Sequence, residues 1–107
     1  MIIVLTTVPF GKGEEIAKKI LEKRYAACIS IKEVRSLYWE NNNIKDEKEE
    51  LLIIKTRKEI FDMLKDFLKS IHPYKIPEII EIKVDDGNKE YLDWLESETS
   101  LKKIRNA

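Results

Sequence analysis

The residues best suited to chemistry in this chain lie in one short segment, His72-Pro73-Tyr74-Lys75-Ile76-Pro77-Glu78. His72 is the only histidine, and the two prolines of the segment restrict its backbone. A neutral imidazole is a common metal ligand, and it titrates near neutral pH. The segment has two interpretations: a rigid support that holds His72 and Tyr74 beside the next strand, or a stiff turn that carries a surface histidine.

Two further residues could join a site. Cys28 is the only cysteine, so no disulfide within the chain is possible. With His72 and a carboxylate it would form a plausible site for a soft or borderline metal ion; alone, after two alanines, it is typical of a small buried hydrophobe. Lys55 follows four apolar residues, and it could extend to solvent, balance Glu50 or hold a small anion in a cleft between subunits.

Adjacent aromatics, Tyr38 and Trp39, lie at the end of a long predicted strand. In a strand they point to opposite sides, which is typical of one core residue and one interface residue. A Ser-His-Asp triad can be written with Ser30 or Ser36, but nothing in the sequence brings its members together.

Composition excludes several classes of protein. Twenty basic and twenty acidic side chains cancel, which argues against a basic surface for nucleic acid or anionic lipid. No run of 18 apolar residues exists for a membrane span. Three isolated glycines form no phosphate loop, and one cysteine cannot bind an iron–sulfur cluster. The single histidine lacks a convincing partner, so we expect no enzyme; the single cysteine favours a reducing compartment, so we predict a cytoplasmic protein.

Hydrophobic periodicity predicts one domain, 1–107, with the element order β-α-β-β-α-β-α. A capping box is expected at Thr56 and Glu59, at the start of the strongest helical pattern. A polar loop is expected at 40–48. The predicted strands are 2–7, 26–39 with a break at 32–33, 49–56 and 79–84, and the predicted helices are 13–25, 57–71 and 91–95, with an extension towards 104.

This order predicts an α+β, ferredoxin-like βαββαβ sandwich with an extra C-terminal helix. Both helices of the repeat would cover one face of a four-stranded antiparallel sheet. In the first and third predicted strands, side chains at both odd and even positions are apolar. The sheet face without helices would therefore be apolar as well. Because a monomer rarely exposes such a face, we expect a homotrimer or a similar assembly to cover it.

Several motifs, in order along nearly the whole chain, resemble the CutA family of divalent-cation tolerance proteins. They are Ala26-Ala27-Cys28, Ser36-Leu37-Tyr38-Trp39-Glu40, Glu50 before Leu51-Leu52-Ile53-Ile54-Lys55-Thr56, His72-Pro73-Tyr74 with Pro77-Glu78-Ile79, and Tyr91-x-x-Trp94. The Asn41-Asn42-Asn43 turn is where the sequence departs most from the family.

The resemblance implies a tight homotrimer, similar in architecture to PII signalling proteins, with a cytoplasmic role linked to copper and other divalent ions. It supplies no reaction. It also implies a cleft between subunits. Its positions here are Cys28, Tyr38, Trp39, Glu50, Lys55, Thr56, His72, Tyr74 and Trp94.

The leading hypothesis is therefore a trimeric protein that binds Cu²⁺ or another divalent cation. His72 would be the nitrogen ligand, and Cys28 and Glu50 are further candidate ligands. The other cleft residues (Tyr38, Trp39, Lys55, Thr56, Tyr74 and Trp94) would contact a bound ligand. The alternatives are a PII-like signalling module that binds a small anion near Lys55, and a structural adaptor trimer whose aromatics serve only packing.

Overall fold

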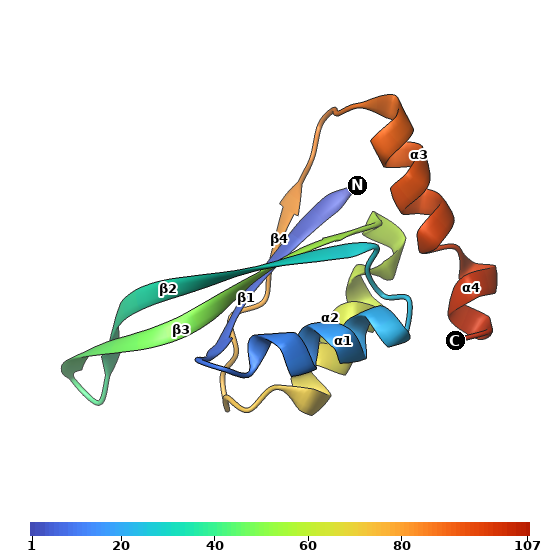
Figure 1. Cartoon of the computed structure of the whole chain (residues 1–107). Helices are drawn as coiled ribbons and strands as arrows, with labels where there is room; N and C mark the ends of the chain where they lie inside the picture. Colours follow the sequence, from blue (N-terminus) through green and yellow to red (C-terminus); the bar gives the residue numbers. More distant parts are fainter.

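A twisted antiparallel sheet in the order β2-β3-β1-β4 forms the centre of the molecule (Figure 1). This computed structural model describes residues 1–107. The helices α1 and α2 lie together on one face, and β2 and β3 extend beyond them as a long hairpin (Figure 1). The elements are β1 (Ile2–Pro9), α1 (Gly13–Glu22), β2 (Cys28–Glu40), β3 (Asn43–Thr56), a 3-10 turn η1 (Lys58–Ile60), α2 (Phe61–Ile71), β4 (Ile80–Lys83), α3 (Lys89–Glu98) and α4 (Leu101–Arg105).

Strand alternation explains which residues form the core. Along β1, buried and partly exposed side chains alternate, and the buried set faces α1 and α2. Burial of each large aliphatic side chain contributes about 1.5–3 kcal/mol to this layer. The α+β, ferredoxin-like arrangement predicted from the sequence is thus confirmed. The buried core is Ile2, Val4, Val8, Ile16, Ile20, Ala26, Leu52, Ile54, Ile60, Leu64 and Leu68.

A hairpin turn lies within the predicted polar loop at 40–48, as its asparagines indicated, but the predicted extent of the loop is wrong. Only Asn41 and Asn42 form the turn, both with positive φ (49° and 62°), and β3 begins directly afterwards. Asparagine tolerates the left-handed region that a tight hairpin requires. In the outer part of the β2–β3 hairpin, cross-strand ion pairs such as Arg35–Asp46 take the place of apolar contacts. The residues there are therefore as polar as those of a loop, although their backbones pair as strands.

Three further boundaries differ from prediction. β2 runs unbroken through 32–33, because Lys32 and Glu33 keep their places in the ladder. The first helix ends at Glu22, and Arg24 adopts a left-handed φ of 64° that stops it. The predicted capping box is absent: Thr56 is the last residue of β3, and its hydroxyl is buried without a hydrogen-bond partner.

The sheet face away from α1 and α2 is here called the open face. It carries large apolar side chains, as predicted; Ile80 is 48% exposed and Ile82 is 43% exposed. α3 packs against one end of β3, so within one chain most of this face has no helical cover (Figure 1). No helix of the chain has the length and apolar character needed to cross a membrane.

Candidate functional site

His72 ends α2 with an extended backbone, which turns its ring back onto β1. Its Nε2 lies 3.0 Å from the carbonyl oxygen of Thr7 and 3.2 Å from Oγ1 of Thr6. Its Nδ1 accepts a hydrogen bond from the backbone N–H of Tyr74 at 3.1 Å. Because Nδ1 accepts, the proton must reside on Nε2, which donates to the Thr7 carbonyl. Both ring nitrogens of a neutral imidazole are therefore engaged within the chain.

The environment of His72 favours this neutral form. Burial lowers the pKa of His72 below its ordinary value. The Thr7 carbonyl and the nearby Glu49 carboxylate act in the opposite direction and offset only part of the effect. A buried neutral imidazole beside a carboxylate has the form of a metal ligand at physiological pH.

Glu49 is the residue that the sequence analysis missed. It is only 5% exposed, and its carboxylate accepts a hydrogen bond from the Tyr74 hydroxyl. Burial, followed by this carboxylate, raises the pKa of Tyr74. The sequence held a signal, because Glu49 and Glu50 are adjacent at the edge of an apolar strand. Alternation must place them on opposite faces, and the family resemblance directed attention to the wrong one.

Tyr38 lies on the same face as Glu49. Partial burial, and then Glu47, Glu40 and Glu49, raise the pKa of Tyr38. Trp39 points to the other side of β2 and is 74% exposed, so neither aromatic belongs to the core of one chain. The His72 group, as we call it, is His72, Tyr74, Glu49 and Tyr38.

A second group lies on the open face, at the far end of β3 from Glu49. The β2–β3 register places Cys28 opposite Lys55, and the Lys55 ammonium donates to Ser30 Oγ at 2.6 Å and lies 3.7 Å from Cys28 Sγ. Tyr91 of α3 approaches the same sulfur; burial, and then Cys28, raise the pKa of its hydroxyl. We call Lys55, Ser30, Cys28 and Tyr91 the Lys55 group. Glu49 and Lys55 are six positions apart on β3, about 20 Å at 3.3 Å per residue.

Glu50 belongs to neither group. It faces α1, where its Oε1 accepts the backbone N–H of Gly13 at 2.7 Å and so stabilises the start of that helix. A Cβ added to Gly13 would lie 2.7 Å from the same oxygen, which explains the glycine. The suggested balance between Lys55 and Glu50 is wrong, because the two side chains lie on opposite faces of β3.

The predicted metal ligands do not meet within one chain. No three His, Cys, Asp or Glu side chains form a cluster that could hold a metal ion. His72, Cys28 and Glu50 occupy the three separate places just described. Of the remaining predicted residues, Thr56 is fully buried on the helix side of β3. Trp94 is 43% exposed on α3, with its ring 5.6 Å from that of Tyr91.

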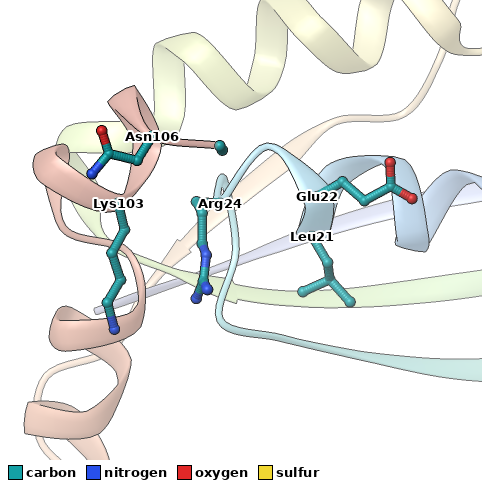
Figure 2. A pocket seen from close by; sticks show the side chains of 6 residues that line it. Leu21, Glu22, Arg24, Lys103 and Asn106 are labelled. Atoms are coloured by element: carbon teal, nitrogen blue, oxygen red, sulfur yellow. The ribbon is translucent and has the colours of Figure 1, made fainter.

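A hollow in the surface lies elsewhere. A cavity of about 500 Å³ opens between the end of α1 and the end of α4 (Figure 2). Arg24 and Lys103 both pair with Glu98 at its border, at 2.8 and 3.4 Å. None of the predicted site residues contributes to it. Its lining is Leu21, Glu22, Arg24, Lys103, Asn106 and Ala107.

A ferredoxin-like chain with a long β2–β3 hairpin, an apolar open face and polar groups at both ends of the apolar part of β3 defines a class of small α+β proteins. Residues 2–98 match the family described as "CutA1 divalent ion tolerance protein". The chain belongs to this family, as its motifs predicted. The prediction that it is not an enzyme agrees with membership, because the family is described by ion tolerance and not by a reaction.

Individual relatives support the same conclusion. The divalent-cation tolerance protein CutA of Pyrococcus horikoshii is 44% identical over 100 residues, which span 92% of this chain and 98% of the relative. Its crystal structure superposes with a TM-score of 0.90 over 94% of this chain and 99% of that one. The PII-like protein CutA of Nostoc, in its apo form, is 34% identical, with a TM-score of 0.90 over 94% and 99% of the two chains.

The relatives differ in compartment. A CutA structure from Archaeoglobus fulgidus is described as periplasmic; it is 36% identical, with a TM-score of 0.90 over 94% of this chain and all of that one. A CutA protein of rice is described as chloroplastic. The cytoplasmic location predicted for this chain remains a prediction.

Proposed function

We propose that this chain binds a divalent metal ion, with Cu²⁺ as the ion to test first, and that His72 supplies the nitrogen ligand. The observation that carries the proposal is the juxtaposition of a buried, neutral His72 with the buried carboxylate of Glu49. Imidazole and carboxylate together suit Cu²⁺ and Zn²⁺. The family description, divalent ion tolerance, supports the same chemistry.

The hydrogen bonds around His72 determine which ring nitrogen a metal ion would bind. Nδ1 carries no proton, and its lone pair accepts a hydrogen bond from the backbone N–H of Tyr74. A metal ion at Nδ1 must displace that N–H, and a shift of Tyr74 would also release Glu49 from the Tyr74 hydroxyl. Binding would thus be coupled to a movement of the segment 72–78. Fewer than three ligands come from one chain, so water or another subunit must supply the rest.

The assembly in this proposal is a homotrimer. The apolar open face supports it, as do the exposed side chains of the hairpin, Leu37, Trp39 and Ile44. Sedimentation equilibrium should give a mass three times 12.7 kDa. A monomer mass at micromolar concentration would contradict the trimer. If the protein is only a structural adaptor, Trp39→Ala should weaken assembly while His72→Ala changes no binding property.

The metal proposal is tested by calorimetric titration of Cu²⁺ with a weak competing chelator present. We expect saturation at one ion per chain or one per trimer. His72→Ala should abolish this binding, and Glu49→Gln should weaken it, while Glu50→Gln should leave it unchanged because Glu50 faces α1. Circular dichroism without metal checks that each variant folds. Copper affinity that survives His72→Ala in a folded protein would exclude His72 as the ligand.

A second candidate function is small-anion binding near Lys55, in the manner of a signalling module. Lys55 favours it because its ammonium pairs with a hydroxyl and a thiol but with no carboxylate of the chain. The Nostoc relative is described as PII-like. A thermal-shift screen of nucleotides and organic acids should give a stabilising compound whose effect Lys55→Ala removes; a screen without such a compound would count against this candidate.

A further inference from the structure

Lys55 is not the only unneutralised cation at its end of the open face. Arg57 follows two positions later, its side chain is 22% exposed, and its Nε is buried without a hydrogen-bond partner. Its nearest carboxylate, on Glu59, lies 3.7 Å from the guanidinium and is 62% exposed. A long contact to an exposed carboxylate neutralises little of the charge.

Strand geometry directs the side chains of Lys55 and Arg57 to the same side of the backbone. Residues two apart in a strand point to the same face, and Arg57 continues the extended backbone of β3 (φ −95°, ψ 149°). Lys55 and Arg57 are therefore separated by roughly 7 Å along the strand. Two cationic side chains that leave the backbone at this spacing, both partly withdrawn from water, raise the local potential more than an exposed pair would.

The surroundings supply polar groups and apolar surface. Ser30 Oγ and Cys28 Sγ contact the Lys55 ammonium, and α3 brings Tyr91 to the same place. Ile3 pairs with Lys55 in the sheet, and Ile53 precedes it on the same face. The corner thus combines two cations and a hydroxyl with aliphatic side chains.

We propose that Lys55 and Arg57 together form a binding site for a small organic dianion, of the phosphate monoester class. The proposal rests on the second function above, small-anion binding near Lys55, and adds Arg57 and the class of ligand. A guanidinium binds two phosphate oxygens through parallel N–H groups, and an ammonium binds a third as a point charge. One dianionic group neutralises both cations, and the aliphatic neighbours favour an ester with an apolar body over the bare ion.

The test is calorimetric titration of the metal-free protein, in the presence of EDTA and at constant ionic strength. The probes are phenyl phosphate, inorganic phosphate and benzoate. Phenyl phosphate should bind most tightly, inorganic phosphate more weakly, and benzoate at least about tenfold more weakly than phenyl phosphate, because it carries one charge. Lys55→Met and Arg57→Met should each weaken phenyl phosphate binding about tenfold or more. Lys55→Arg, which keeps the charge, should retain binding.

Lys45→Met is the matched control, since Lys45 lies on the same strand and the same face but within the exposed hairpin. It makes the same charge change and should leave affinity unchanged. Equal losses in Lys45→Met and Lys55→Met would show a general charge effect and overturn the site. If Lys55→Met abolishes binding and Arg57→Met does not, small-anion binding stands and the two-cation site is wrong. If no probe binds the parent protein, small-anion binding near Lys55 and the two-cation site are both wrong.

Discussion

The hydrogen bond from the Tyr74 hydroxyl to Glu49 gives the sharpest prediction, because Tyr74→Phe should have effects of opposite sign on stability and on metal binding. The carboxylate is 5% exposed, so water cannot replace the lost donor. Hydrogen bonds to charged groups contribute about 1.5–3 kcal/mol. Tyr74 itself is partly exposed, so we expect a loss of about 2 kcal/mol in the free energy of unfolding, and a Tm lower by about 10 °C for a chain of this size.

The same substitution releases Glu49 for a metal ion. If Glu49 is a ligand, Tyr74→Phe should raise the affinity for Cu²⁺ while it destabilises the metal-free protein. Urea unfolding and the competition titration measure the two effects, at one fixed protein concentration because assembly makes stability concentration-dependent. Tyr25→Phe is the control, since the Tyr25 ring packs edge-on against Phe67 at 5.6 Å and is not hydrogen-bonded to a buried carboxylate.

A double-mutant cycle with Glu49→Gln separates the hydrogen bond from other effects of the lost hydroxyl. The coupling free energy between the two substitutions should be about 1 kcal/mol or more, as expected for a hydrogen bond to a charged group. Additive effects on stability would refute the proposed strength of the contact. An unchanged or lower copper affinity in Tyr74→Phe would refute the role of Glu49 as a ligand.

Three further predictions concern the framework around the site. Because the pKa of His72 is lowered, the folded state favours its neutral form. The contribution of His72 to stability is therefore complete above about pH 6.5 and is lost as pH falls through the folded-state pKa. Urea unfolding at pH 7.5 and at pH 5 should show this loss, and His72→Gln should reduce the pH dependence. Gly13→Ala should cost about 1–3 kcal/mol in urea unfolding, because its Cβ would meet a carboxylate oxygen at 2.7 Å, whereas Gly87→Ala, with contacts of 3.6 Å or longer, should cost little. Asn42→Gly should keep or raise Tm, since glycine accepts the left-handed φ of 62°, and Asn42→Val should lower it; equal Tm values for these two variants would contradict the turn assignment.

The sequence was sufficient to predict the sheet, the two covering helices and the family. Those depend on periodicity and on motif order, which are local properties of the chain. The length of the β2–β3 hairpin was mispredicted because polar residues such as Lys45 and Asp46 pair across two strands without burial. The capping box failed because tertiary pairing kept Thr56 in β3, and local propensity could not reveal that competition.

The site was predicted as one set of residues around a cleft between subunits, and within one chain these residues lie in separate places for a geometric reason. Motif resemblance lists positions but does not give the face on which each side chain lies. The strand period of two would have separated Glu50 from Lys55 at once, since an odd spacing places them on opposite faces. It would not have identified the partner of Glu49, because Tyr74 is brought to it from 25 positions away by a proline-bounded segment.

The separation of the two polar groups bears on the assembly we propose. A twofold interface is isologous, so each subunit contributes the same surface patch to it. A cyclic trimer uses heterologous contacts, so the end of one subunit that bears His72 can lie against a different surface of its neighbour. Ligands missing from the His72 group would then come from across an interface. For this reason copper stoichiometry and oligomeric mass should be measured on the same preparation: one ion per chain from a stable monomer would show that the His72 group binds metal without a neighbouring subunit.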